Sequence, residues 1–506
     1  MKPIDIEQQF EQDWVRMFQN IANLFFEETE MTLGGSASDE SAVRVSFAWE
    51  EDAGTLRGRA DLRDGADTFS SDYREEAVHS GDPKDGKRQL KRVLSHVFLD
   101  VLEQSTGIIQ PWGILTGMRP TKLYHKMRRE GLSHDEISER LVTEYRISPE
   151  KIELMKRIVD RQLKMIPDLD RIGEEVSVYI GIPFCPTKCA YCTFPAYAIP
   201  RRGNRVQSFL DGLHVEIEEI GAWLKERGVK VTSVYFGGGT PTSIEAHEMD
   251  ALYEKLFAFF PDIREVREIT VEAGRPDTIT PEKINVLKKW DIDRISVNPQ
   301  SYTDETLKAI GRFHTVQETI DKFHLSRDMG MNNINMDLII GLPNEGTEEF
   351  AHSLAETEKL QPESLTVHTL SFKRASEMTR NKKKYKVADR GTVVKMMNMA
   401  EDWTAGNGYV PYYLYRQKNI LGNLENVGYS KPGEESIYNI VIMEEVQTII
   451  GLGCGASSKF VHPQTGRITQ FHNPKDPAAY ILSYSESIDK KIEMLDGLFG
   501  EPVPAK

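Results

Sequence analysis

From residue 176 onward the sequence repeats one pattern, in which a short apolar strand is followed by a glycine-containing turn and an amphipathic helix. The candidate strands are Val176–Ile182, Val231–Phe236, Glu268–Glu272, Arg294–Val297, Ile334–Ile340 and Ser364–Leu370. The helical stretch from Arg205 to Glu226 is the clearest, and Thr280 with Pro281 opens another. Strands that alternate with helices predict a parallel sheet with right-handed crossovers. Six such units favour an open barrel over a doubly wound sheet, although periodicity alone leaves both possible.

The first third of the chain has a different character. Residues Ala42 to Trp49 alternate as a strand, and Gly54 to Leu62 form a candidate hairpin partner. A polar, acid-rich stretch follows from Asp64 to Gly86. Helical periodicity then runs from about Arg88 to Leu102 and from about Ser148 to Ile166. This part of the chain therefore predicts a separate α+β unit.

The length of the chain also requires more than one core, because 506 residues exceed what a single domain usually holds. We predict an α/β protein with a partial (β/α)6 barrel over residues 171–374. An N-terminal accessory α+β domain is expected over residues 1–170, and a mixed C-terminal domain over residues 375–506.

Charge and hydropathy exclude several classes of protein. The net charge of −15 argues against bulk binding of nucleic acid or anionic membranes, which a basic field would favour. No apolar run is long enough to span a bilayer, and Met1 to Ala22 lack the apolar core of a signal peptide. The sequence contains four cysteines, which argues against a disulfide framework. We expect a cytoplasmic protein.

Three of the four cysteines, Cys185, Cys189 and Cys192, lie within eight residues, directly after the first strand of the repeating pattern. Iron–sulfur clusters are held by thiolates on short loops, and three ligands would leave one iron open for another molecule. A structural zinc ion normally takes four ligands, and three adjacent core thiols have no packing rationale, so both alternatives are weaker. Cys454, between two glycines, is interpreted as a small buried core residue.

Two companions of the triplet carry a family resemblance. They are Tyr191 between the cysteines and the turn Gly237-Gly-Gly-Thr-Pro241 at the end of the next strand. With them the chain resembles radical S-adenosylmethionine (SAM) enzymes. That resemblance implies a 4Fe-4S cluster on Cys185, Cys189 and Cys192. It also implies that SAM chelates the open iron and is reductively cleaved to a 5′-deoxyadenosyl radical.

Longer motifs indicate a branch of that family. They are Tyr179-Ile-Gly-Ile-Pro-Phe-Cys, Phe236-Gly-Gly-Gly-Thr-Pro-Thr, Arg294-Ile-Ser-Val-Asn-Pro-Gln and Asp337-Leu-Ile-Ile-Gly-Leu-Pro. Together they resemble oxygen-independent coproporphyrinogen III oxidase and its relatives over about residues 176–343. The N-terminal unit and the stretch Arg119-Pro-Thr-Lys resemble the HemZ branch, coproporphyrinogen dehydrogenase.

The resemblance assigns roles residue by residue. Tyr179, Gly238 and Glu272 match positions that contact the cofactor on the cluster, and Tyr191 occupies an aromatic slot beside it. Positions around a second SAM molecule are matched by Gly239, Thr240, Gln300, Arg312 and Asp337. Several of these residues fall at predicted strand ends, where barrel enzymes gather their sites. Each one alone would read equally well as a turn or capping residue.

The implied reaction is the oxidative decarboxylation of coproporphyrinogen III propionates to vinyl groups in haem biosynthesis. It would involve an external electron donor and acceptor, of flavodoxin or ferredoxin type. A haem-binding carrier and a radical-SAM methyltransferase are the alternatives. Phe194 stands where the standard oxidase has a further cysteine. The region Ser436 to Met443 keeps the Asn of the carriers' His-Asn-x-x-Tyr-Trp signature but lacks its His and its aromatic pair.

Two groups of basic residues remain outside this assignment. The first, on one helical face, consists of Arg119, Lys122, Lys126 and Arg129. The second is the run from Arg380 to Lys386. Both are interpreted as solvated surface. His314 and His368 have no partner that the sequence can assign, so neither is a predicted site residue.

Overall fold

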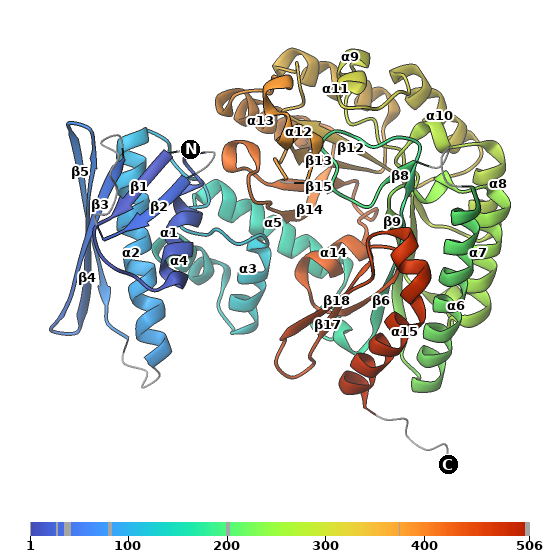
Figure 1. Cartoon of the computed structure of the whole chain (residues 1–506), viewed down its shortest axis with the longest axis horizontal. Coiled ribbons are helices and arrows are strands. Elements are labelled where there is room, and N and C mark those ends of the chain that lie inside the picture. Colours follow the sequence, from blue (N-terminus) through green and yellow to red (C-terminus); the bar gives the residue numbers. More distant parts are fainter. Residues whose placement is uncertain are drawn as a thin grey trace. The chain divides into compact units, whose positions relative to one another are not determined.

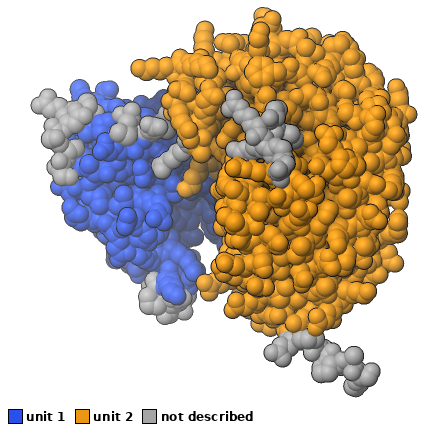
Figure 2. Space-filling view, turned by 45° about the vertical axis from the view of Figure 1, so that its right-hand side comes forward, with its two compact units in different colours: residues 1–157 blue, residues 158–506 orange. Residues whose placement is uncertain are grey.

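The computed structural model describes residues 2–26, 29–34, 42–78, 83–198, 203–373 and 375–500. The chain forms two compact units, residues 1–157 and 158–506 (Figure 2). The division falls inside helix α5 (Pro149–Met165), upstream of the boundary expected at residue 170. Arg374, where the barrel was expected to end, lies outside the described residues.

The N-terminal unit is built on a five-stranded sheet in the order β2-β1-β3-β4-β5 (Figure 1). The strands are β1 Lys2–Ile6, β2 Thr29–Leu33, β3 Val43–Asp52, β4 Thr55–Asp64 and β5 Asp67–Glu76. The helices are α1 Gln12–Ala22, α2 Pro83–Thr106, α3 Pro120–Arg129 and α4 His134–Tyr145. Apolar side chains of α1 and α2, such as Phe18 and Phe98, pack on Phe47 of β3 and form the core of this unit.

The predicted hairpin of this unit is confirmed, since β3 and β4 pair antiparallel with Phe47 opposite Ala60. Strand β5 was not predicted, because it lies in the polar stretch after Asp64. It pairs along the whole of β4, and most of its side chains are exposed or half-buried. A strand at a sheet edge needs little apolar alternation, so hydropathy gave no signal for it.

The second unit contains the six predicted parallel strands, each placed within two residues of its predicted ends. They are β6 Val176–Ile182, β9 Val231–Gly238, β10 Glu268–Glu272, β11 Arg294–Ser296, β12 Ile334–Ile340 and β13 Ser364–Thr369. They pair side by side in chain order, all parallel. This unit is therefore a mixed α/β structure with a large sheet (Figure 1).

Helices follow the strands as the repeating pattern predicts. Those of the repeating part are α6 Gly203–Arg227, α7 Ala246–Phe259, α8 Pro281–Lys289, α9 Asp304–Ala309, α10 Val316–Asp328 and α11 Thr347–Leu360. The C-terminal part adds α12 Glu377–Arg380, α13 Arg390–Gly406, α14 Ile437–Glu444 and α15 Pro477–Phe499. Thr280 caps α8 as predicted, with its hydroxyl accepting from the Lys283 amide at 3.4 Å. None of the helices in the described part of the chain combines the length and apolar character needed to cross a membrane.

The C-terminal part lengthens the same sheet at both edges, whereas the sequence predicted a further domain from residue 375. Its strands are β14 Val410–Tyr415, β15 Asn426–Ser430, β16 Thr448–Gly453, β17 Ser457–Val461 and β18 Ile468–His472. Strand β16 pairs parallel with β6, and β15 pairs antiparallel with β13. The first and sixth strands of the parallel set are thus each covered by a strand from the C-terminal part.

The position of α5 gives a prediction about truncation. The side-chain amide of Gln162 donates to the Tyr412 backbone carbonyl at 3.0 Å and to the Glu444 carboxylate at 2.9 Å. Ile166 and Leu169, which follow in the chain, belong to the same buried apolar cluster as Tyr412. We expect a chain that starts at Ser148 to fold and load iron. A chain that starts at Arg171 loses these contacts, each buried aliphatic side chain being worth about 2–5 kcal/mol. Thermal unfolding and iron content of the two truncated chains test this; equal behaviour would contradict it.

Candidate functional site

A cavity of about 540 Å³ opens at the carboxyl ends of the parallel strands. The predicted site residues that line it are Tyr179, Cys185, Cys189, Tyr191, Cys192, Gly238, Gly239, Glu272, Gln300, Arg312 and Asp337. Thr240 does not line the cavity itself, but its hydroxyl is 3.3 Å from the sulfur of Cys185, which does. The fold therefore brings residues from five of the parallel strands and their loops to one place.

The three cysteines lie on the loop that follows β6. Cys185 ends β7 (Phe184–Cys185), which pairs with β8 (Tyr197–Ala198), so both ends of the loop are held together. Its middle is held by Ala190, whose amide donates to the Ile310 carbonyl at 2.9 Å and whose carbonyl accepts from the Met378 amide at 3.0 Å. All three thiols are free and face the same cavity.

The electrostatics of the thiols suit a bound cation. Burial raises the pKa of Cys185 to about 11, and the charges of Cys189 and Cys192 act in the same direction. Burial and Cys189 likewise raise the pKa of Cys192. Thiolates at these positions are therefore costly without a metal, and a metal–thiolate bond removes that cost.

The donor set consequently fits an iron–sulfur cluster in its chemistry and in the room available. Within the described ranges, no three Cys, His, Asp or Glu side chains already converge on one metal position. We therefore expect cluster binding to draw the three thiols of the loop together.

The glycine turn after β9 lets two strand ends approach closely. The Gly239 amide donates to the Ile182 carbonyl at 2.7 Å, and a Cβ on Gly239 would lie 2.5 Å from the Phe184 carbonyl oxygen. Gly238 has φ +103°, a conformation that disfavours other residues. A side chain at either position would push the turn away from the cysteine loop. This explains two of the predicted site glycines in steric terms.

Aromatic side chains form one wall of the cavity. Tyr235 stacks on Tyr438 with ring centroids 4.5 Å apart and on Tyr179 at 6.1 Å. The Tyr235 hydroxyl donates to Glu272 at 2.6 Å. Burial raises the pKa of Glu272 to about 7, and the charge of Asp337 adds to that rise. Glu272 can therefore exchange a proton near neutral pH.

This raised pKa gives a prediction about stability. Between pH 4.5 and about 7 folded Glu272 keeps a proton that the unfolded chain releases, so stability falls as the pH rises and the loss is complete above about 7. Glu272→Gln stays neutral, so its stability relative to the natural chain should increase over this interval, by at most about 3 kcal/mol. Urea unfolding of the metal-free proteins at about pH 5 and about pH 8 measures it. The same difference at both pH values would show that Glu272 is not protonated when folded.

Asp337, which also lines the cavity, lies at the centre of a hydrogen-bonded group. The side-chain amides of Asn298 and Asn335 each donate to its carboxylate at 2.8 Å, and the His368 Nε2 is 3.6 Å away. Burial by itself would raise the pKa of Asp337, but His368 and the other donors outweigh burial and lower it. The neighbouring Gln300 has φ +66°, and its backbone N–H donates to the backbone carbonyl of Asp337 at 2.9 Å. Asp337 is therefore a fixed negative charge in the cavity.

His368 is a cavity residue that sequence reasoning missed. It projects from β13, with its Nδ1 3.2 Å from the Tyr415 hydroxyl and its Nε2 toward Asp337. Its place within the last strand of the parallel set was the available signal, because that strand also ends at the cavity. His314 is buried instead, 3.9 Å from Asp277, and burial lowers its pKa to about 3.

Several buried polar atoms of the cavity have no hydrogen-bond partner within the described part of the chain. They are Ser296 Oγ, Asn298 Oδ1, Gln300 Oε1, Arg312 Nε and Tyr438 Oη. Buried polar groups are normally paired, so a group of unpaired ones around a cavity indicates a polar ligand. Their mixture of donors and acceptors suits a molecule with amino, carboxylate and hydroxyl groups, such as SAM.

Cys454 is buried, as the sequence predicted, and it also reaches the edge of the cavity. Its thiol lies 3.3 Å from the Pro474 carbonyl and 3.2 Å from that of Lys475, and burial raises its pKa to about 12. These contacts keep it a neutral thiol. Of the basic face on α3, Lys126 and Arg129 are exposed, consistent with solvated surface.

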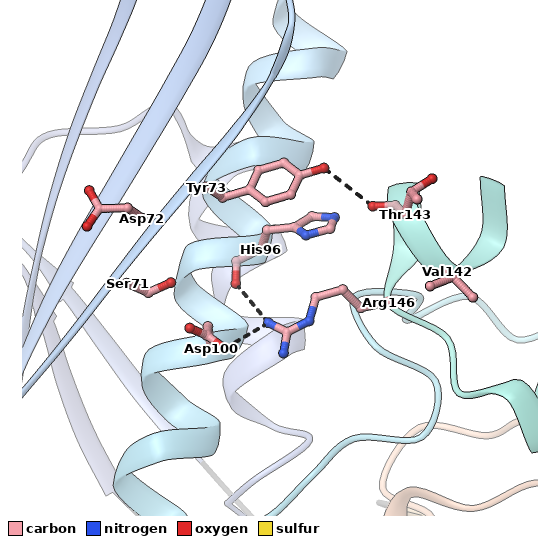
Figure 3. Close-up of a pocket in the computed structure, with 8 residues that line it drawn as sticks. All are labelled: Ser71, Asp72, Tyr73, His96, Asp100, Val142, Thr143 and Arg146. Carbon is pink, nitrogen blue, oxygen red and sulfur yellow. Dashed lines mark hydrogen bonds and ion pairs between the residues drawn. The ribbon is translucent and has the colours of Figure 1, made fainter. Parts of the chain in front are cut away.

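A second cavity, of about 330 Å³, lies in the N-terminal unit between β5, α2 and α4 (Figure 3). His96 stacks on Tyr73 at 4.0 Å, and its Nε2 is 2.9 Å from the Glu144 carbonyl. Arg146 pairs with Asp100 at 3.2 Å and with Glu103 at 2.8 Å. These polar groups satisfy one another, so this cavity does not indicate a ligand.

Comparisons with known proteins agree with this geometry. Residues 179–356 match the model of the Radical SAM superfamily. Over 488 residues, 96% of each chain, the sequence is 61% identical to the oxygen-independent coproporphyrinogen-III oxidase-like protein HemZ of Bacillus subtilis (strain 168).

More distant relatives match a smaller part of the chain. The sequence is 27% identical over 327 residues to the heme chaperone HemW of Escherichia coli (strain K12), covering 64% of this chain and 80% of that protein. The solved structure of the radical SAM enzyme coproporphyrinogen III oxidase (HemN) from Escherichia coli superposes with a TM-score of 0.51 at 20% identity. It covers 64% of this chain and 72% of that one, and it supports the fold alone.

Proposed function

This chain belongs to the radical SAM superfamily, in its oxygen-independent coproporphyrinogen-III oxidase-like group, and we propose that it decarboxylates coproporphyrinogen III without oxygen. The observation that carries the proposal is the cavity. Three free thiols, two half-buried carboxylates and unpaired polar atoms line one space at the strand ends, in a chain 61% identical to a HemZ protein.

The proposed step removes one hydrogen atom, one carbon dioxide molecule and one electron from each reacting propionate, and it leaves a vinyl group. A 4Fe-4S cluster with SAM supplies the hydrogen-abstracting radical when bound. The remaining electron leaves to an external acceptor, and an external donor of flavodoxin or ferredoxin type provides the electron consumed in cleaving SAM. We place this reaction in the cytoplasm, where thiols stay reduced.

The residues of the chain hold and orient these molecules. Cys185, Cys189 and Cys192 would ligate the cluster, since they are the three free thiols of one loop. Glu272 and Asp337 offer acceptors to the amino and ribose groups of SAM. Arg312 and Lys373, which also line the cavity, provide positive charge for the propionates of the substrate.

The aromatic wall excludes water from the reacting carbon atoms. The three stacked rings of Tyr179, Tyr235 and Tyr438 present apolar faces to the cavity. The pyrrole rings of a porphyrinogen, which saturated methylene bridges join, can each lie against such faces. Exclusion of water protects a radical from side reactions.

An anaerobic assay with coproporphyrinogen III, SAM and a chemical reductant tests the proposal. We expect a vinyl-bearing product and 5′-deoxyadenosine to appear together. Stoichiometric haem uptake without decarboxylation would favour a carrier, as in the heme chaperone relatives. Deoxyadenosine without the vinyl product would indicate a different substrate, including that of a methyltransferase, and would overturn the porphyrinogen assignment.

A further inference from the structure

The segment Phe372 to Lys386, after β13, reverses the charge of the rest of the chain. Its fifteen residues contain seven lysines and arginines and one glutamate, whereas the whole chain has a net charge of −15. Lys383 and Lys386 are exposed, and so is the Lys384 side chain, at 66%. A strongly basic segment on an acidic protein is a local feature that a solvated connector does not require.

This segment packs directly on the cysteine loop. The Met378 amide of α12 donates to the carbonyl of Ala190, between Cys189 and Cys192, at 3.0 Å. Tyr385, flanked by Lys384 and Lys386, is buried in the same apolar cluster as Ala190. The lysines around Tyr385 therefore stand beside the loop that holds the three thiols.

A second element brings more positive charge to the same loop. The Ala190 amide donates to the Ile310 carbonyl at 2.9 Å, and the Thr187 hydroxyl donates to the Gly311 carbonyl at 2.8 Å. Lys308, at the end of α9, and Lys188, inside the loop, are both exposed. We call Lys188, Lys308, Arg380, Lys383, Lys384 and Lys386 the basic surface. Five residues after Lys308, Phe313 is 70% exposed, and aromatic side chains of this kind are enriched at protein interfaces.

We propose that the basic surface is the docking site of an acidic one-electron carrier protein that reduces the cluster. The inference rests on the proposed radical chemistry but not on the choice of substrate. Each turnover needs one electron from outside, and electron transfer is efficient only over a short distance. The outer side of the cysteine loop, where Cys189 and Cys192 are half-buried and Lys188 is exposed, is the approach that brings a donor close to the cluster.

Charge complementarity selects the class of partner. Reduced ferredoxin, an acidic protein, gives up one electron to the cluster and returns to its oxidised form. Opposite charges accelerate such encounters and make them sensitive to salt. Interfaces for transient electron transfer are small, which suits a surface formed by one loop, one helix end and one basic segment.

The test compares two triple variants of the full-length protein with the same change in charge. The first carries Lys383→Glu, Lys384→Glu and Lys386→Glu. The control carries Lys225→Glu, Lys230→Glu and Lys490→Glu, three exposed lysines of α6, of the residue before β9 and of α15. Lys230 precedes the first residue of β9, at the end of the sheet opposite to the cavity.

The first measurement is the binding of oxidised ferredoxin at low and high salt. We expect the dissociation constant of the basic-surface variant at low salt to rise at least about tenfold, and its salt dependence to flatten. The control should stay within about twofold of the natural chain. Equal losses in both variants, or no loss in either, would overturn the proposal.

The second measurement is the rate of cluster reduction, followed by absorbance after anaerobic reconstitution and without any porphyrinogen. With reduced ferredoxin the basic-surface variant should be at least about tenfold slower, and with dithionite its rate should be unchanged. A similar loss with dithionite would mean that the variant damages the cluster, and the docking proposal would be wrong. A weaker affinity for coproporphyrinogen with normal ferredoxin binding would equally overturn it. Failure to form vinyl product leaves both readouts intact, so the two proposals fail separately.

Discussion

Cys185→Ala, Cys189→Ala and Cys192→Ala are each expected to abolish the cluster absorbance and the cleavage of SAM. The three thiols share one loop and one cavity, and two ligands cannot hold a 4Fe-4S cube that already lacks a fourth protein ligand. Iron quantitation after anaerobic reconstitution should fall to the background of the metal-free protein. Deoxyadenosine formation should fall with it.

Cys454→Ala is the matched control, because Cys454 is the fourth thiol and reaches the edge of the same cavity. Its sulfur faces the carbonyls of Pro474 and Lys475 at 3.3 and 3.2 Å, which occupy its hydrogen-bonding capacity. We expect iron content and SAM cleavage to be retained. Loss of the cluster in this variant as well would show that Cys454 is a ligand and that the three-thiol site is incomplete.

The parallel strands were predictable because each is buried on both faces and is therefore apolar along its length. Strand β6 is an example, with six of its seven residues buried. Strand β1 was missed because it is five residues long and contains a proline and an aspartate. It is nevertheless an interior strand of the sheet, because it pairs with both β2 and β3. The hydropathy of a short segment carries no information about which other strands it pairs with.

The placement of the C-terminal strands has the same cause. Strand β16 pairs with β6, and the register joins Thr448 to Val176 across more than half of the chain. A long loop closure of this kind costs entropy that only the complete sheet repays, so no local pattern reports it. The C-terminal strands were therefore expected as part of a separate domain, although they extend the sheet of the parallel strands.

The site shows a similar division. The cysteines and the glycine turn were readable because their spacing is local. His368 was not, since its partners Asp337 and Tyr415 lie on other strands and its Nδ1 meets a hydroxyl 47 residues away. Tyr235 and Tyr438, which form the stacked wall, were missed for the same reason. An aromatic residue on a strand reads as core until the fold shows which side of it faces a cavity.

Asp337→Asn is expected to slow turnover about ten- to hundredfold while iron content stays at the level of the natural protein. The carboxylate accepts from Asn298 and Asn335 at 2.8 Å, so an amide there removes the charge and sets one donor against another. It also removes the negative partner of His368. A hydrogen bond to a charged group is worth about 1.5–3 kcal/mol, which gives the expected factor.

Glu345→Gln provides a matched control for Asp337→Asn, since both replace by its amide a carboxylate that accepts a hydrogen bond from a neighbouring side chain. Glu345 is 6% exposed, contacts Ser301 outside the cavity lining, and has its pKa raised to about 7 by burial. Its amide therefore resembles a form that it already adopts near neutral pH, and turnover should stay within about twofold. Turnover, iron content and SAM affinity of the two variants separate the outcomes. If Asp337→Asn turns over at the rate of the natural protein, this carboxylate is not part of the site. If turnover and iron content fall equally in both variants, the effect is on folding, because only Asp337 faces the ligand.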